Sequence, residues 1–342
     1  MKTVSIKDIA KETGLSITAV SLILNNKSTT IPQETINRVK EVALKFGYRP
    51  NVIASSLRTK KTKTIGYVMP SIENSFFSEI AKKVEKIVEE YGYSIIICSS
   101  NDKFEKDYNL IQMLTSRMID FLIFCPSVET LHGTNIQKII NLLQSINTPY
   151  IVVDRQIKGD IKSKVVCDDH QGGMLATKHL IDSGHRKIAC ITGPLEMSSA
   201  YNRYLGYLDC LKENNIKFDD KYVFYGNFDF DSGYLNTLEA LKTDVTAIFV
   251  NNDMMAYGAL KAIKEKGKKV PQDISIVGYD DLIFSELLDV PLTTIHQDID
   301  AIAECIGDYI ISVLERKNTE ITIKAIPSYL VERATVAKRG DK

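Results

Sequence analysis

The sequence predicts a small all-α head of the helix-turn-helix type, then a short hinge helix, then a larger two-lobed α/β core. Three observations carry this prediction. Two short amphipathic stretches within residues 5–25 meet at Gly14, apolar strands alternate with amphipathic helices from Thr64 onward, and this alternation starts a second time near residue 165. The chain has 342 residues, which is enough for two or three domains.

The first two helices of the head each have an apolar face and a mixed face. The residues at helical spacing on the inward sides are Ile6, Ile9, Ala10, Leu15, Val20, Ile23 and Leu24. The outward side of the second helix carries a short, chemically mixed set that does not suit a core: Ile17, Thr18, Ser21, Leu22 and Asn25. We therefore expect the second helix to lie in the major groove of DNA.

A third helix and a hinge complete the N-terminal part. Pro32 suits a first helical turn, Gly47 ends the helix, and the apolar residues between them keep helical spacing: Ile36, Val39, Val42, Ala43 and Phe46. The stretch Tyr48–Asn51 breaks this helix, and Val52–Arg58 leaves room for one or two further turns. Because so short a helix is marginal alone in water, we expect it to fold only when docked on DNA and on a partner copy.

The core is expected to hold two similar lobes. The strands of the first are Ile65–Met69, Ile95–Cys98, Phe121–Cys125 and Tyr150–Val153, separated by helices near 76–91, 105–117 and 136–146. The strands of the second are Val165–Cys167, Ile188–Thr192, Tyr222–Tyr225, Ala247–Val250 and Ile274–Val277, with helices such as 172–183, 200–214 and 254–266. This alternation indicates doubly wound parallel sheets. Open sheets of this kind bind ligands beyond their carboxyl ends, so we expect a small-molecule site between the lobes.

These elements set the expected domain boundaries. The head takes residues 1–49, the hinge helix and linker take 50–63, and the effector-binding and dimerisation core takes 64–342. Within the core, we expect the first lobe at about 64–160 plus 293–320 and the second lobe at about 161–292 plus 321–342.

Charge is divided unevenly along the chain. Residues 1–63 carry 12 Lys/Arg against 4 Asp/Glu, whereas the rest of the chain carries 31 against 39, so a formal net charge of zero conceals an N-terminal part of +8. A basic excess of this size is typical of a surface that contacts phosphates. A solvated basic surface is the alternative.

Several classes of protein and site are disfavoured. The six cysteines are widely spaced without a CxxC pair, the five histidines lack zinc-site spacing, and we expect reduced core thiols with neither metal nor cofactor. Neither a phosphate loop, nor a nucleophile elbow, nor GxGxxG after the first strand occurs, so an enzyme is not expected. Without an apolar signal segment or a run long enough to span a bilayer, the expected location is the cytoplasm.

Ordered motifs resemble the lactose/galactose-repressor (LacI/GalR) family of bacterial transcription regulators. The head motifs are Ser5–Ala10, Gly14–Ser16 and Ala19–Asn25, and the hinge motif is Gly47–Asn51 with Ala54 and Leu57. The core motifs are Gly184–Ile188 with Gly193-Pro194, Arg203 with Gly206-Tyr207, Asn252-Asp253 with Ala256 and Gly258-Ala259, Gly278–Asp281, and Pro291–Ile295. The likeness covers nearly the whole chain. A correctly ordered hinge and five core motifs are far more specific than a lone helix-turn-helix.

The resemblance implies a periplasmic-binding-protein-like core and a homodimer on a pseudo-palindromic double-stranded operator. Recognition helices then enter major grooves, and paired hinge helices enter the central minor groove. Leu57 would insert as a wedge between base steps. The cost of unstacking the bases is then offset by the additional contacts that a kinked duplex makes with the protein. Packing of Leu57 on the core is the alternative. The residues expected at the DNA are Ser5, Ser16, Ile17, Thr18, Ser21, Leu22, Asn25, Asn51, Ala54, Ser55 and Leu57.

One residue of the second helix departs from the family pattern. Many members have Arg at the position of Leu22, and an Arg there makes a bidentate contact to guanine O6 and N7, which leucine cannot make. We expect Ile17 and Leu22 to contact thymine methyl groups, and Ser16, Thr18 and Ser21 to hydrogen-bond bases or phosphates. Inward packing of Leu22 is the alternative.

The resemblance to sugar- and purine-responsive members also implies an effector cleft. The residues expected to line it are Phe76, Phe77, Asp154, Arg155, Arg203, Phe228, Asn252 and Asp280. Carboxylates accept paired hydroxyl hydrogen bonds, arginine donates a planar fork, and an aromatic ring covers an apolar sugar face. Core packing of Phe76 or Phe77, a solvated helix face for Arg203, and a capping role for Asp280 are the alternatives.

The effector class stays open between alternatives. The segments Ile188–Leu195 and Thr293–Gln297 look nearest the ribose- and purine-responsive branch, and we expect a sugar, a pentose such as ribose. Met197 stands where a purine-binding member has a basic side chain, which disfavours a nucleobase. Control by a purine, or by a phosphorylated carrier protein docked on Lys82, Lys83 and Lys86, are alternatives with the same DNA-binding role. A sugar-capture binding protein without a regulatory role would not need the basic head.

Overall fold

The structure is a computed structural model that describes residues 4–24, 30–48, 61–157, 159, 163–316 and 323–339. The chain divides into two units, Met1–Thr62 and Lys63–Lys342, which are described separately below. The expected hinge helix, Val52–Arg58, lies outside the described residues. No helix in the described part of the chain is both long enough and apolar enough to cross a membrane.

The described residues of the head form the helices α1 (Ile6–Thr13), α2 (Ile17–Leu24) and α3 (Gln33–Lys45). The Asp8 carboxylate accepts hydrogen bonds from the backbone N and the Oγ of Ser5, which stabilises the start of α1. Gly14 ends α1 with a φ of 71°, a left-handed conformation that glycine adopts without strain. The apolar residues predicted to face inward form or pack against the core of the head: Ile6, Ile9, Ala10, Leu15, Val20, Ile23, Leu24, Ile36, Val39, Val42, Ala43 and Phe46. The predicted periodicity of all three helices is confirmed.

The first lobe is built on a six-stranded parallel sheet with the strand order β11-β5-β4-β3-β1-β2. The strands are β1 (Thr64–Met69), β2 (Ser94–Ser99), β3 (Phe121–Phe124), β4 (Tyr150–Val153), β5 (Lys164–Cys167) and β11 (Ile323–Ile326). Alternate residues of each strand face opposite sides. In β1, for example, Tyr67 belongs to one apolar cluster and Val68 to the other.

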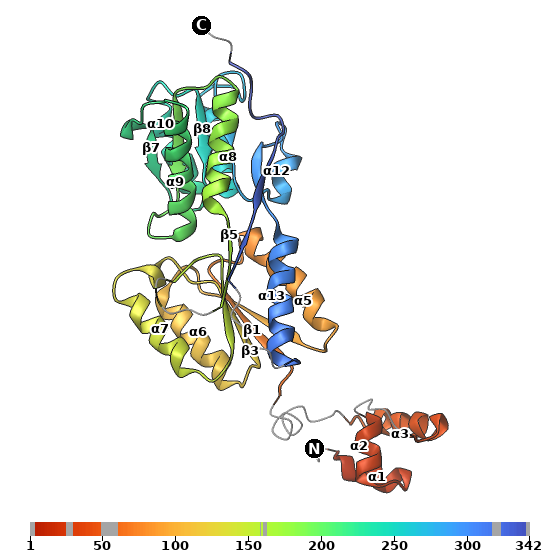
Figure 1. The fold of residues 1–342 in the computed structure, drawn as a ribbon. Coiled ribbons are helices and arrows are strands. Elements are labelled where there is room, and N and C mark those ends of the chain that lie inside the picture. The colour runs from red at the N-terminus through yellow and green to blue at the C-terminus, as the bar shows by residue number, and fades with distance from the viewer. Residues whose placement is uncertain are drawn as a thin grey trace. The chain divides into compact units, whose positions relative to one another are not determined.

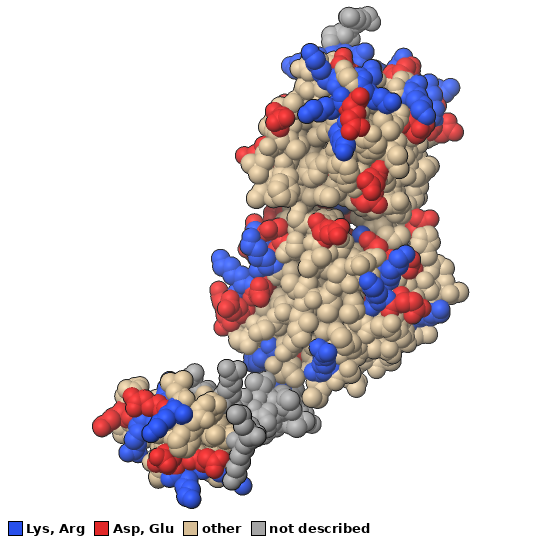
Figure 2. All heavy atoms as spheres, turned by 180° about the vertical axis from the view of Figure 1, so that it is seen from behind, with Lys and Arg blue, Asp and Glu red and all other residues tan. Residues whose placement is uncertain are grey.

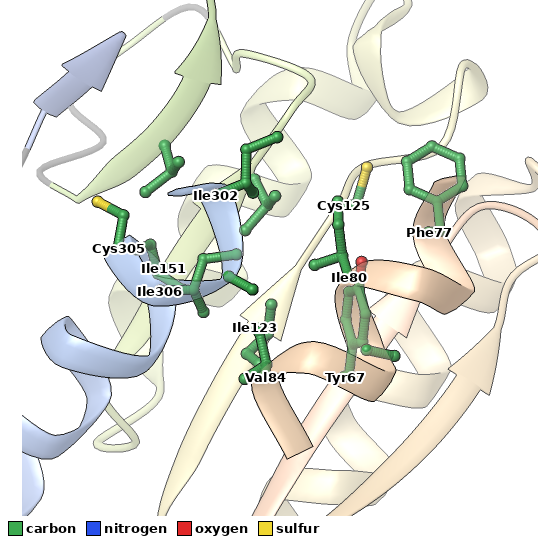
Figure 3. Packing of buried hydrophobic residues seen from close by; sticks show 14 of the residues in the cluster. Tyr67, Phe77, Ile80, Val84, Ile123, Cys125, Ile151, Ile302, Cys305 and Ile306 are labelled. Carbon is green, nitrogen blue, oxygen red and sulfur yellow. The ribbon is translucent and has the colours of Figure 1, made fainter. Parts of the chain in front are cut away.

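Helices cover both faces of this sheet. Helices α5 (Ser75–Glu89) and α13 (Ile299–Leu314) pack on one face, and α6 (Phe104–Ser116) and α7 (Asn135–Ser145) pack on the other. Figure 3 shows part of the apolar cluster on the first face, which includes Ile80 and Val84 of α5, Ile302 and Ile306 of α13, and Ile123 of β3. A short 3₁₀ helix, η1 (Glu129–Leu131), follows β3.

The second lobe repeats this layout with a four-stranded parallel sheet of order β7-β6-β8-β9. Its strands are β6 (Ile188–Thr192), β7 (Val223–Tyr225), β8 (Ala247–Val250) and β9 (Ser275–Val277), and η2 (Asp220–Tyr222) precedes β7. Helices α8 (Asp169–Asp182) and α9 (Ser198–Glu213) cover one face, and α10 (Phe230–Ala240) and α11 (Asp253–Glu265) cover the other. Gly173 lets α8 and α9 approach closely, because a Cβ at this position would stand 2.2 Å from the Arg203 carbonyl oxygen.

The expected two-lobed α/β core is confirmed, and Figure 1 shows its lobes joined by extended segments. These segments include β10 (Thr294–Gln297) and β12 (Ser328–Val331), which pair antiparallel, and α12 (Ile283–Leu287) lies close to them in sequence and in the figure.

The lobe membership of two strands differs from the sequence expectation. We expected Val165–Cys167 to open the second lobe and 321–342 to belong to it, but β5 and β11 both lie in the first sheet. The reason is backbone pairing: Val152 and Val153 of β4 pair with Lys164 and Val165 of β5, and β5 pairs in turn with β11.

Candidate functional site

A cleft lies between the two lobes of the core. Its lining residues are Asn74, Phe76, Phe77, Asp154, Arg155, Met197, Ser199, Arg203, Phe228, Asn252, Asp280 and Gln297. All eight residues that we expected at the effector cleft are among them. Asn74, Ser199 and Gln297 were not expected there from the sequence, and Met197 was considered only as evidence against a nucleobase.

The first lobe supplies side chains that follow strands β1 and β4. Asn74 caps α5, because its Oδ1 accepts a hydrogen bond from the backbone N of Phe76 at 3.1 Å. The rings of Phe76 and Phe77, in the first turn of α5, meet edge to face with their centroids 5.3 Å apart. Asp154 and Arg155 come directly after β4, and the φ of Asp154 is 65°. The first lobe thus offers two aromatic rings beside a carboxylate and a guanidinium.

The second lobe supplies side chains from four segments. Arg203 lies on α9, and Asn252 caps α11 by accepting from the backbone N of Met255 at 2.9 Å. The same Asn252 side chain donates to the carbonyl oxygen of Phe228 at 3.0 Å, which ties the loop after β7 to α11. Asp280 follows β9, and its φ of 108° is a strained value for a residue other than glycine.

Ion pairs hold both arginines, and both partners are buried in the pairs made by Arg203. Arg203 Nε lies 2.8 Å from Asp169 Oδ1, and its Nη1 donates to the carbonyl oxygen of Asn251 at 2.6 Å and lies 3.6 Å from Asp280 Oδ1. Arg155 Nη1 donates to Asp102 Oδ1 at 2.6 Å and to the carbonyl oxygen of Pro126 at 3.0 Å. Both guanidinium groups are therefore fixed before any ligand arrives.

Burial controls the protonation of the acidic residues here. It raises the pKa of Asp280 well above its ordinary value, although the charge of Arg203 opposes the rise. Burial also raises the pKa of Asp154, against the charges of Arg155 and Arg203, and it raises the pKa of Asp169 to about 6. Burial deprives these carboxyl groups of hydrating water, so a ligand that donates hydrogen bonds to them would stabilise them.

Two buried polar atoms of the cleft have no hydrogen-bond partner within the described residues: Arg155 Nε, a donor, and Gln297 Oε1, an acceptor. The Gln297 side chain is otherwise engaged, because its Nε2 donates to Asp280 Oδ1 at 2.6 Å. Unpaired buried groups are costly, and a ligand that both donates and accepts hydrogen bonds would satisfy both atoms.

The residues missed by the sequence analysis left different signals. Asn74 directly precedes a helix that follows a strand, which is a capping signal that would have marked it. Gln297 lies at the end of β10, which joins the lobes, and Ser199 lies at the start of α9. The sequence alone holds no signal that these two face the cleft, because their position depends on how the lobes meet.

The head presents part of the expected DNA-contacting set. Ser16, Ile17 and Thr18 are exposed at the start of α2, where Ser16 Oγ accepts from the backbone N of Ala19 at 3.1 Å. Leu22 and Ser21 are half-buried. The expected positions Asn25, Asn51, Ala54, Ser55 and Leu57 lie outside the described residues. On the face drawn in Figure 2 the head carries side chains of both charge signs, so its basic excess does not form a uniform patch there.

Comparisons with known proteins place the chain. The model of the bacterial regulatory proteins of the lacI family matches residues 5–51, and the periplasmic binding protein-like domain matches residues 177–336. The HTH-type transcriptional repressor PurR of Pasteurella multocida (strain Pm70) is 35% identical over 341 residues, which cover 98% of this chain and 99% of that protein. The chain belongs to the LacI family. It is therefore a DNA-binding transcriptional repressor with an effector-binding core, and not an enzyme.

Other relatives of this LacI-family chain agree. PurR of Vibrio campbellii (strain ATCC BAA-1116) is 32% identical, with 98% of this chain and 99% of the relative covered. The lac repressor dimer bound to operator and the anti-inducer ONPF superposes with a TM-score of 0.84 at 28% identity, covering 98% of this chain and 100% of that one. A LacI-family regulator from Enterococcus faecium with bound ribose gives a TM-score of 0.71 at 28% identity, covering 81% and 100%.

Proposed function

We propose that this repressor binds a double-stranded operator as a homodimer, and that a small polyhydroxylated compound bound in the cleft controls its affinity for the operator. A pentose such as ribose is the favoured effector. The observation that carries this proposal is that two atoms buried at the cleft, Arg155 Nε and Gln297 Oε1, have no hydrogen-bond partner among the residues that the structure describes. A hydroxyl group donates and accepts at once, so a compound with several hydroxyl groups can satisfy both atoms.

The rest of the lining suits the same ligand. Carboxylates of Asp154 and Asp280 accept hydrogen bonds from paired hydroxyls, and the rings of Phe76 and Phe77 offer apolar surface to the carbon face of a sugar. Ribose bound to the Enterococcus faecium relative supports this class of effector.

A purine is the second candidate, and the curated relatives favour it. These relatives are repressors named PurR, a name that points to purine control. The aromatic rings of the cleft would stack on a nucleobase as well as on a sugar. Against this candidate, the Met197 side chain that lines the cleft is apolar and only 1% exposed. It therefore provides no charged partner for a ring nitrogen or a carbonyl oxygen of a purine.

Docking of a phosphorylated carrier protein gains little support from α5. Lys82 and Lys83 stand beside acidic partners, Glu79 at 3.4 Å and Asp300 at 2.5 Å. Such pairs are ordinary on a solvated helix face. The alternative of a sugar-capture protein without a regulatory role conflicts with the lacI-family head at residues 5–51.

Isothermal titration calorimetry of the full chain tests the effector. The panel holds ribose, other pentoses, common hexoses, and the purines guanine, hypoxanthine and adenine. We expect saturable binding of a pentose, and roughly 10- to 150-fold weaker binding by Asp280→Asn and Arg203→Met, because a hydrogen bond to a charged group contributes about 1.5–3 kcal/mol.

The matched control is Asp182→Asn, at the far end of α8, where the carboxylate pairs with Lys178 and is 58% exposed. Its dissociation constant should equal that of the wild type. Binding of a purine with no response to any pentose would reject the sugar and establish the second candidate. Operator titration with and without the ligand then decides between inducer and corepressor, because only a difference in affinity between two states shifts the population.

A further inference from the structure

Arg155 is held on three sides in the first lobe. Its Nη1 donates to Asp102 Oδ1 at 2.6 Å and to the Pro126 carbonyl oxygen at 3.0 Å, and its guanidinium carbon lies 5.6 Å from the centroid of the Phe77 ring. The Arg155 side chain is 5% exposed. These contacts leave Nε as the unpartnered donor described above. The orientation of this guanidinium therefore decides where a ligand finds a donor.

The segment that carries Asp102 is built to present its carboxylate. Asn101 and Asp102 have φ values of 54° and 55°, so two successive residues other than glycine adopt the left-handed conformation. Such strain persists only where the surroundings enforce it. Here the backbone N of Asp102 donates to the carbonyl oxygen of Pro70 at 3.1 Å, and Asp102 Oδ1 accepts from the backbone N of Val128 at 3.0 Å. The backbone N and one carboxylate oxygen of Asp102 are thus each held by a hydrogen bond apart from the contact with Arg155.

Arg155 has a second acidic neighbour, which competes for it. Asp154 Oδ2 lies 3.9 Å from Arg155 Nε, close enough for attraction but too far for a hydrogen bond. A buried guanidinium needs a paired anion. Without the Asp102 carboxylate, Arg155 would turn to Asp154, and the two groups would satisfy each other instead of a ligand.

We propose that Asp102 is a positioning residue of the effector cleft: it binds the outer edge of the Arg155 guanidinium and so keeps both Arg155 Nε and the Asp154 carboxylate open for the ligand. This inference rests on the proposed function of the cleft. Asp102 acts through Arg155 and is not itself among the residues that line the cleft.

The first test needs no ligand. In a crystal structure of ligand-free Asp102→Asn, the guanidinium of Arg155 is expected to have moved to within hydrogen-bond distance of Asp154. Asparagine tolerates the left-handed backbone and keeps Oδ1, the atom that accepts from both Val128 and Arg155, so the segment should persist while the negative charge that holds Arg155 is lost. An Arg155 side chain that stays in place would overturn the proposal, whatever the effector is.

The second test is a double-mutant cycle on ribose affinity, measured by calorimetry with Asp102→Asn, Arg155→Met and the double variant. We expect Asp102→Asn to weaken ribose binding at least tenfold, and the double variant to bind within twofold of Arg155→Met alone, because Asp102 has no effect once Arg155 is gone. Losses that multiply would show an independent structural role and reject the proposal.

The control is Glu129→Gln, which removes the charge of a neighbouring ion pair with Lys103 while its side chain keeps an acceptor for the backbone N of Phe104. Its ribose affinity should stay within twofold of wild type. If the wild-type protein does not bind ribose, the proposed function is wrong. If the wild type binds ribose and the Asp102→Asn variant binds it with the same affinity, only the inference about Asp102 is wrong.

Discussion

Arg203 of α9 and Asp169 of α8 form an ion pair with both side chains almost completely buried, at 4% and 5% exposure, and with Nε and Oδ1 2.8 Å apart. The pair joins the two helices on one face of the second lobe and aims the Arg203 guanidinium toward the cleft. The guanidinium carbon also lies 3.6 Å from the centroid of the Tyr279 ring. A residue outside the cleft thus sets the position of one inside it.

The first prediction concerns this pair. Asp169→Ala should lower the free energy of unfolding of the core by about 3–5 kcal/mol, because it leaves a guanidinium buried without its main partner. The double variant Asp169→Ala with Arg203→Met should recover part of the loss, since both charges are gone. Urea unfolding followed by circular dichroism measures both values. A double variant with the summed loss of its single variants would show that the pair is not coupled.

The second prediction concerns the dimer. On α12, Ile283, Phe284 and Leu287 are 70%, 59% and 71% exposed, which leaves a large apolar face on a helix of five residues. We expect a second copy to cover it, so Leu287→Asp should give monomers in analytical ultracentrifugation and weaken operator binding. Stability of the isolated core should change by less than about 0.5 kcal/mol, because the side chain is exposed there.

Leu235→Asp on α10 is the control, because Leu235 is an equally apolar side chain that is 60% exposed. It should remain dimeric. If the Leu287→Asp variant remains dimeric and its stability is unchanged, the dimer contact lies elsewhere.

The third prediction concerns base recognition by α2. Leu22 is half-buried and is absent from the apolar cluster of the head, as far as the described residues show. Leu22→Arg should shift the operator preference toward guanine at one position per half-site, because a bidentate contact discriminates by about 1–3 kcal/mol. Binding selection from a randomised operator library measures this preference.

Leu44→Arg supplies the control for added charge. Leu44 is 81% exposed on α3, so the new guanidinium should raise affinity for all sequences alike without changing base preference. An unchanged preference in Leu22→Arg would mean that this position does not face the bases.

The fourth prediction concerns pH. Asp253 is buried and accepts from the backbone N of Leu282 at 2.9 Å, Ser285 Oγ at 2.6 Å and Thr294 Oγ1 at 2.7 Å. Burial raises the pKa of this carboxyl from 3.8 to about 6, although these hydrogen bonds oppose the rise. Between these two pH values the folded state holds a proton that the unfolded chain has lost. The contribution of Asp253 therefore makes the free energy of unfolding fall as pH rises from about 4 to about 6.

This fall is at most ~1.4 kcal/mol for each pH unit. Urea unfolding from pH 4 to pH 7 should show a shallower decline for Asp253→Asn than for the wild type. Asp300→Asn, with a carboxylate that is 73% exposed, should keep the wild-type slope. Parallel curves for wild type and Asp253→Asn would show that the native carboxyl titrates as it does in the unfolded chain.

Local sequence patterns were enough to predict most elements of the fold. In the head, inward-facing residues such as Ile9 and Val20 recur at helical spacing. The strands from β1 to β9 stand out as short apolar segments between amphipathic helices. The eight expected cleft residues were named from motifs and from the family resemblance. Most of them lie at the end of a strand or the start of a helix, whereas Arg203 lies within α9 and Phe228 lies in the loop after β7.

The sequence by itself determined whether each segment is a helix or a strand, and that the protein is a DNA-binding regulator. Both follow from local properties, namely helix and strand periodicity and the family motifs. Only the tertiary structure decided that β5 and β11 join the first sheet, that Gln297 faces the cleft, and that Asp102 meets Arg155. Each of these is a contact between residues far apart in the chain. Such contacts depend on backbone pairing between distant strands, on how the two lobes pack against each other, and on ion pairs between distant residues.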